Sequence, residues 1–152
     1  MKLKMTGLAV LAATALAAGC GGEDEEPLSK AEFVKQGNKN CSTFEEEVGK
    51  DAEKAFAGMQ SAQDLTPDKA REFFDVALPK FNDAVNELDG LVPPEGDEET
   101  VQAIVEAGKT DAQKIEDAKD DDEAIVGFVV ENSATPDFDE KARAYGLDSC
   151  GG

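Results

Sequence analysis

Histidine and tryptophan are absent from this 152-residue chain, and Tyr145 is its single tyrosine. The absence of histidine excludes Ser-His and Cys-His nucleophile pairs, imidazole metal ligands and the Glu-x-x-His pattern of di-iron helical bundles. The sequence also has no glycine-rich phosphate loop and no Ser-x-x-Lys motif. With one tyrosine and no tryptophan, an aromatic sugar-binding platform is not expected. The sequence therefore predicts no catalytic residue and no cofactor.

Basic residues are few: 15 Lys and Arg stand against 34 Asp and Glu, which gives a formal net charge of −19. This charge argues against binding to nucleic acid, whose affinity comes mainly from phosphate neutralisation by Lys and Arg. It favours solubility and cationic partners. Paired carboxylates can hydrolyse glycosides, but so acidic a chain contains such pairs by chance. An enzyme that uses carboxylates alone is therefore an alternative without a specific signal.

Long apolar runs are also scarce, and the main one lies near the N-terminus. Residues 8–18 are apolar except for one threonine, Lys2 and Lys4 precede them, and small residues follow as far as Gly19. This is the layout of a secretory signal, and the run is too short to span a bilayer, which takes roughly 20 residues. The segment Leu16-Ala-Ala-Gly-Cys20 resembles the signal of bacterial lipoproteins, although that family prefers leucine where this chain has Ala17. The resemblance implies that Cys20 receives a diacylglycerol and that the chain is cut just before it. The alternative is a plain secretory signal with a free thiol at Cys20.

The expected anchor divides the chain into three parts: a signal peptide at residues 1–19, a lipidated cysteine with an acidic tether at 20–27, and a helical domain at 28–152. Residues 1–19 hold two of the basic residues and none of the acidic ones, so the remainder carries a net charge of −21. Four consecutive acids, residues 23–26, follow Cys20 and two glycines. They repel each other and anionic headgroups, so the domain should stand off the membrane. The expected location is the outer face of the cell membrane, with the membrane itself as a partner through Cys20.

Cys41 and Cys150 remain once Cys20 is lipidated, and two cysteines outside the cytoplasm usually pair. The chain has no C-x-x-C motif, so a structural disulfide is favoured over a redox couple or two separate thiols. It would close a loop of more than 100 residues.

Apolar periodicity predicts four helices. The first begins at the capping box Ser29-Lys-Ala-Glu32, carries a stripe from Phe33 to Met59, and is expected to bend or break at its glycines, most readily over residues 36–40. The second begins at Thr66-Pro67 and contains Pro79, which predicts a kink. The third has Asp97 as its cap, with an apolar face from Val101 to Ile115, and the last runs from Thr135 to Gly146. Residues 124–130 are rich in β-branched side chains, which would suit a strand, but no second strand is available to pair with them, so they are expected to form a helical turn or buried loop. Together these segments predict an all-α antiparallel bundle of three to four helices, with the disulfide fastening the C-terminal segment to the first helix.

A resemblance to a family rests on short motifs spread along the chain. Leu28-Ser-Lys-Ala-Glu-Phe33, Cys41, Leu88, Leu91-Val-Pro-Pro94 and Ala144-Tyr-Gly-Leu-Asp-Ser-Cys150-Gly resemble those of small exported lipoproteins of actinobacterial type. The resemblance implies a helical fold and an exported location, and it implies no activity. The segment Gly37-Asn-Lys-Asn40 departs from it, because it is more polar than a first helix of this kind should be.

The acidic run near residue 120 is a weak candidate for binding Ca²⁺. With Asp120 as the first position of an EF-hand loop, Asp122 and Glu131 fall on ligand positions, but Ile125 stands where glycine is required. A solvated acidic loop is the favoured interpretation.

The leading functional hypothesis is therefore a noncatalytic binding or interaction module. Its ligand would be a small apolar molecule in a pocket near Pro79, or another envelope protein. A structural envelope protein without a ligand is the alternative, alongside the carboxylate enzyme.

Overall fold

The computed structural model describes residues 26–130 and 134–151, and within these ranges the regular structure is entirely helical. The five α-helices are α1 (Lys30–Ala55), α2 (Pro67–Asp89), α3 (Glu98–Ala118), α4 (Asp122–Val130) and α5 (Pro136–Tyr145), and two short 3₁₀ helices are η1 (Ala62–Asp64) and η2 (Asp148–Cys150). The predicted all-α bundle is confirmed. The segment expected to be a helical turn or loop is the nine-residue helix α4, which Asp121 caps by accepting hydrogen bonds from the amides of Glu123 (2.9 Å) and Ala124 (3.0 Å).

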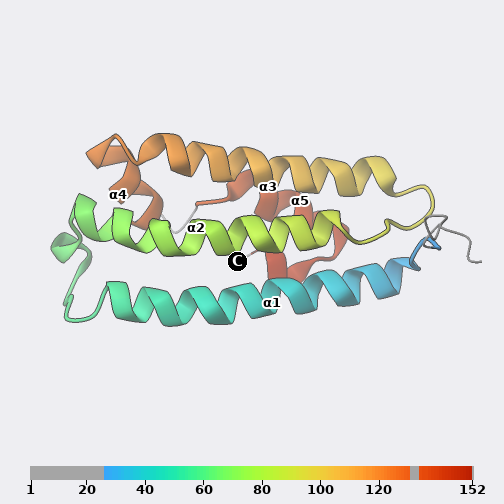
Figure 1. The fold of residues 1–152 in the computed structure, drawn as a ribbon, viewed down its shortest axis with the longest axis horizontal. Coiled ribbons are helices and arrows are strands. Elements are labelled where there is room, and N and C mark those ends of the chain that lie inside the picture. The colour runs from blue at the N-terminus through green and yellow to red at the C-terminus, as the bar shows by residue number, and fades with distance from the viewer. Residues whose placement is uncertain (1–25, 131–133, 152) are drawn as a thin grey trace, which may run out of the picture.

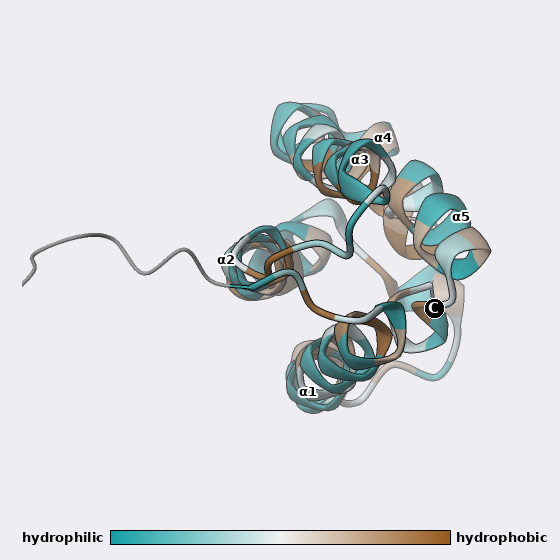
Figure 2. Ribbon diagram, turned by 90° about the vertical axis from the view of Figure 1, so that its right-hand side faces the viewer, coloured by the Kyte–Doolittle hydropathy of each residue, from teal (hydrophilic) through white to brown (hydrophobic). Residues whose placement is uncertain are grey.

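Three long helices form the framework. In Figure 1, α1, α2 and α3 run antiparallel, with α2 between the other two. Viewed end-on in Figure 2, they make a curved layer, and α5 and the C-terminal segment lie on its concave side. Helix α5 packs on α3, η2 packs on α1, and α4 packs on α2 and α3.

The helix ends follow most of the sequence signals. The side chain of Ser29 accepts a hydrogen bond from the amide of Glu32 (3.3 Å), whose carboxylate accepts one from the amide of Ser29 (3.2 Å), so the capping box is confirmed. Thr66 caps α2, and Gly146 ends α5 with a φ of 105°, the left-handed conformation that glycine adopts readily. Helix α1 ends at Ala55, before Met59, and α2 continues through Pro79.

The break predicted over residues 36–40 is wrong, because α1 is continuous there, and the residues that suggested it contact the C-terminal segment. Gly37 is buried, and a Cβ atom at this position would lie 2.5 Å from Cδ2 of Leu147. The Asn38 side chain donates to the carbonyl of Gly146 (3.1 Å) and accepts from the amide of Ser149 (2.8 Å). The polar segment is therefore explained by tertiary hydrogen bonds. Asn40 adds another to the carbonyl of Ala84 on α2 (3.0 Å).

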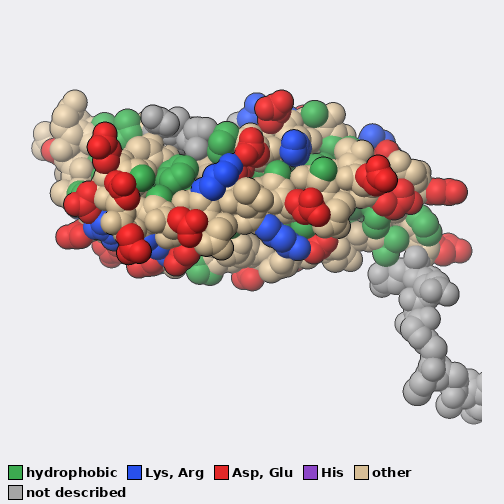
Figure 3. Space-filling view, turned by 90° about the horizontal axis from the view of Figure 1, so that it is seen from above, with side chains coloured by type: hydrophobic (Ala, Val, Ile, Leu, Met, Phe, Trp, Pro, Cys, Tyr) green, Lys and Arg blue, Asp and Glu red, His purple; other side chains and the backbone are tan. Residues whose placement is uncertain are grey.

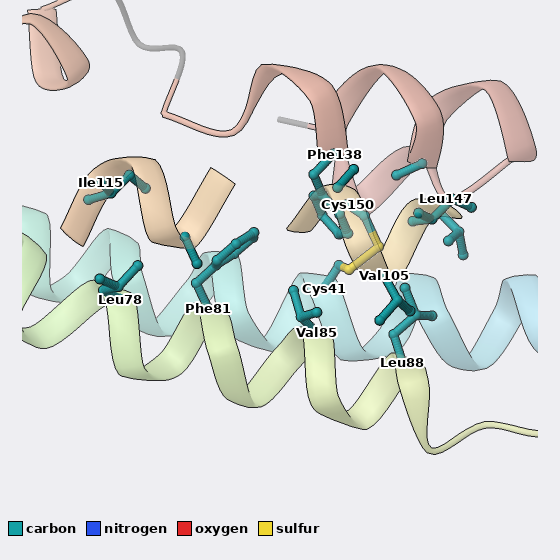
Figure 4. Close-up of a cluster of buried hydrophobic side chains, with 14 of the residues drawn as sticks. Cys41, Leu78, Phe81, Val85, Leu88, Val105, Ile115, Phe138, Leu147 and Cys150 are labelled. Carbon is teal, nitrogen blue, oxygen red and sulfur yellow. A yellow bond between two sulfur atoms is a disulfide. The ribbon is translucent and has the colours of Figure 1, made fainter. Parts of the chain in front are cut away.

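The disulfide between Cys41 and Cys150 is present, as predicted, and fastens η2 to α1. Figure 4 shows the disulfide among buried hydrophobic side chains, with Phe138 on one side and Val85 on the other. Leu88, Val105 and Leu147 complete this part of the core.

Asp111, which belongs to no recognisable sequence motif, is fully buried on α3 and holds the start of α5. Its carboxylate accepts hydrogen bonds from the amides of Asp137 (3.1 Å) and Phe138 (3.0 Å) and from Nζ of Lys114 (2.8 Å). The side chain of Thr135, which precedes α5, does not cap the helix. Asp111 thus supplies from another helix the acceptor that an N-cap normally provides.

Asp97 lies at the start of α3, as predicted, but its side chain does not cap that helix. Its carboxylate accepts a hydrogen bond from the hydroxyl of Tyr145 (2.7 Å) and lies 3.4 Å from Nζ of Lys30. Burial raises the pKa of Tyr145 above its ordinary value, and the hydrogen bond to Asp97 acts in the same direction. The contact ties the beginnings of α1 and α3 to the end of α5.

Candidate functional site

An apolar cavity of about 410 Å³ lies between the C-terminal half of α1, the middle of α2, Ile115 of α3, α4, the start of α5 and η2. Its volume falls within the range of ordinary ligand pockets, roughly 300–1,000 Å³. Most of the wall is aliphatic or aromatic, and the disulfide between Cys41 and Cys150 forms part of it.

Phenylalanine dominates this wall. Seven of the eight phenylalanines of the chain line the cavity: Phe44, Phe56, Phe73, Phe74, Phe81, Phe128 and Phe138. Neighbouring rings contact one another in two series, with centroid separations of 5.1–6.4 Å in the series Phe56–Phe73–Phe74–Phe128 and 5.4–5.6 Å in Phe44–Phe81–Phe138. These are the separations of favourable aromatic pairs, so the rings hold one another in place around the space.

The apolar stripe predicted on the first helix divides into two parts. In the first part Phe33, Gly37 and Cys41 are buried in the core. Beyond Cys41 the stripe continues at every fourth residue (Phe44, Val48, Ala52 and Phe56) on one helix face, and all four of these side chains line the cavity. No residue between Cys41 and Ala70 is fully buried. This half of α1 therefore presents an apolar face to the cavity, with Phe44 and Phe56 in contact with Phe81 and Phe73 of α2.

A closed and empty cavity of this volume would destabilise the fold too strongly. At roughly 24 cal/mol per Å³, a closed cavity of about 410 Å³ would cost on the order of 10 kcal/mol, as much as the whole stability of a typical domain. The wall includes the exposed residue Glu45, so the space reaches the surface. Its apolar lining gives water few hydrogen-bond partners.

The polar part of the wall is small and acidic. It consists of Glu45 on α1, Thr135 and Asp139 at the start of α5, and Ser149 on η2; no Lys or Arg is among the lining residues that the structure describes. The hydroxyl of Thr135 donates to Oδ1 of Asp139 (2.9 Å). Burial raises the pKa of Asp139 above its ordinary range, against the hydrogen bond from Thr135, which lowers it. Arg143, one turn further along α5, donates to the carbonyl of Gly151, and its charge also lowers the pKa of Asp139.

The cavity lies where the sequence placed a candidate pocket, since Ala77, Leu78 and Phe81 line it on either side of Pro79. Pro79 itself is exposed. The position of Pro79 in the sequence therefore indicated the part of α2 that lines the cavity. The aromatic lining was not predicted, because a helical stripe shows which face of a helix is apolar but not which residues lie opposite that face.

The acidic run near residue 120 has structural roles. Asp121 caps α4, and Asp122 forms an ion pair with Arg71 of α2, which also donates to the carbonyl of Lys119 (2.7 Å). Asp120 is exposed, and Glu131 lies outside the described residues. Over residues 26–130 and 134–151, no group of three or more acidic or cysteine side chains is placed to hold a metal ion.

Cys20, the expected lipidation site, and nearly all of the tether lie outside the described residues. Within the part that is described, none of the helices combines the length and the apolar character needed to cross a membrane. The face seen in Figure 3 carries many more acidic than basic side chains, in line with the composition. Comparison of the chain with protein-family models, with curated proteins and with solved structures finds no match.

Proposed function

We propose that the protein is an exported lipoprotein, anchored at the outer face of the cell membrane through Cys20, whose helical domain binds a small apolar ligand. The observation that carries the binding proposal is the cavity of about 410 Å³ lined by seven phenylalanines. For comparison, an engineered apolar cavity of about 150 Å³ already takes up benzene. The signal-like N-terminus and the Cys41–Cys150 disulfide support export, because disulfides persist in oxidising compartments.

Binding is tested with a neutral apolar dye, N-phenyl-1-naphthylamine, whose fluorescence rises in an apolar site. We expect saturable enhancement with the intact protein. Ala52→Phe should remove it, since Ala52 lines the cavity from α1 and is only half-buried there. Ala103→Phe, on the exposed face of α3, is the matched control and should bind as the wild type does. No enhancement, or equal enhancement in both variants, would refute the proposal.

The anchor is tested separately. Cys20→Ser should release the protein from the membrane fraction or leave it unprocessed, and the wild-type protein should have the mass of a chain that begins at a diacylated Cys20. An unmodified N-terminus on the native protein would contradict this part of the proposal.

A further inference from the structure

The distribution of apolar and polar residues in the cavity wall indicates which class of ligand the cavity can bind. Most of its wall is apolar, but Glu45 of α1, Thr135 and Asp139 at the start of α5, and Ser149 of η2 carry oxygen atoms. A ligand that fills the space therefore meets an apolar surface over most of its length and a small polar segment of the wall. This pattern suits an amphiphile better than a pure hydrocarbon.

The charges of that polar segment have one sign. Glu45 and Asp139 are the charged residues among the described lining, and both are acidic. Of the neighbouring cations, Arg143 donates to the carbonyl of Gly151 and acts on Asp139 through its charge, and Lys114 bridges Asp111 and Asp137. An anionic headgroup would meet the carboxylates of Glu45 and Asp139, whereas a cationic headgroup would be attracted to them.

Asp139 is the best placed of the two acids. It is half-buried, and Oδ1 already accepts a hydrogen bond from Thr135. Its raised pKa shows that the protein stabilises the ionised carboxylate less well than water does. A cation brought next to it would restore that lost stabilisation and form a charge-assisted hydrogen bond.

We infer that the ligand is a cationic amphiphile, with an apolar chain among the phenylalanines and an ammonium group at Asp139. The inference rests on the proposed function, because it needs a ligand in this cavity. The net charge of −19 assists the approach of such a ligand, but a general attraction of this kind would not depend on one carboxylate.

The test compares three ligands of equal chain length, decylammonium, 1-decanol and decanoate, by titration calorimetry at neutral pH and below their aggregation thresholds. With the intact wild-type protein we expect decylammonium to bind about ten-fold more tightly than 1-decanol, the ratio given by one hydrogen bond between charged groups. Decanoate should bind most weakly. This series requires no substitution, so it stands whether or not a variant folds.

Two substitutions locate the effect. Asp139→Asn should weaken decylammonium binding about ten-fold and leave 1-decanol binding within about two-fold. Glu140→Gln removes the same charge from the next, exposed residue of α5 and should change neither. Circular dichroism confirms that both variants are folded.

The outcomes separate the two proposals. If all three ligands bind but decylammonium has no advantage, or if Glu140→Gln has the same effect as Asp139→Asn, the inference is wrong and the apolar binding function stands. If neither these ligands nor the neutral dye bind, both are wrong.

Discussion

Two glycines of α1 should respond in opposite ways to the same substitution. Gly37 is buried in the first half of the helix, whereas Gly49 is exposed in the second half, where an added Cβ atom would have nothing within 4 Å. Alanine is favoured over glycine inside a helix by up to about 1 kcal/mol. Gly49→Ala should therefore raise the free energy of unfolding by about 0.5–1 kcal/mol.

At Gly37 the same gain is opposed by overpacking. The new Cβ would lie 2.5 Å from Cδ2 of Leu147 and 3.3 Å from Cδ1 of Leu88. Both leucines are among the largest fully buried side chains, so neither can turn aside without displacing others. Overpacking of a dense core costs about 1–3 kcal/mol, so Gly37→Ala should lower the free energy of unfolding by about 1–2 kcal/mol after the helical gain.

Urea denaturation with the disulfide intact measures both effects as shifts of the midpoint at constant slope. Leu147→Ala provides the coupling test, since it removes the atoms that the new methyl group meets. In the double variant Gly37→Ala/Leu147→Ala, the alanine at position 37 should cost less than it does alone. Equal stabilisation by Gly37→Ala and Gly49→Ala, or no coupling to Leu147, would refute the packing argument.

Asp111→Ala should lower the free energy of unfolding by about 3 kcal/mol, because it leaves the first amides of α5 without their buried acceptor; a loss below about 1 kcal/mol in urea denaturation would contradict its capping role. Reduction of Cys41–Cys150 reopens a loop of 109 residues and should cost up to about 4–5 kcal/mol in the chain-entropy treatment, so calorimetry that gives the same Tm with and without reductant would contradict it. Tyr145 should ionise above the ordinary tyrosine pKa of about 10, so the stability that its neutral phenol contributes is complete below that pH and is lost as the pH rises through the raised pKa. Alkaline titration of the ultraviolet absorbance of Tyr145 measures its pKa directly, because the chain has no tryptophan. The pKa should be lower in Asp97→Asn than in the wild type. A wild-type pKa near the ordinary tyrosine value would contradict burial of the phenol.

The helices and their order were predictable because each carries a local signal. The capping residues Ser29 and Thr66, the terminal Gly146 and the apolar periodicities act over a few residues, so they can be read without knowledge of the partners. The disulfide followed from the number of cysteines and the expected compartment.

The errors share a different physical origin. Gly37 and Asn38 suggested a weak point of α1 because their local helix propensity is low. In the fold, Leu147 occupies the space that a side chain at position 37 would fill. The amide of Ser149 donates a hydrogen bond to the side chain of Asn38, and both contacts join residues more than 100 positions apart. Asp111 supplies the cap of another helix, and no pattern within α3 names its partners. The one signal available was an acid at an otherwise apolar position, three residues after Gly108 and four before Ile115.

The cavity shows the same limit at the scale of the whole site. Its wall contains small as well as large side chains: the phenylalanines are accompanied by Ala52, Ala77, Ala84 and Ala134. In a helical stripe alanine counts as apolar and predicts core, yet alanine opposite phenylalanine leaves room that a larger residue would fill. A chain selected for stability alone gains by filling such a space. The proposed ligand would fill this apolar space, next to the half-buried carboxylate of Asp139. The cavity-filling variant Ala52→Phe and the charge variant Asp139→Asn therefore test the proposed function more directly than any change in the sealed part of the core.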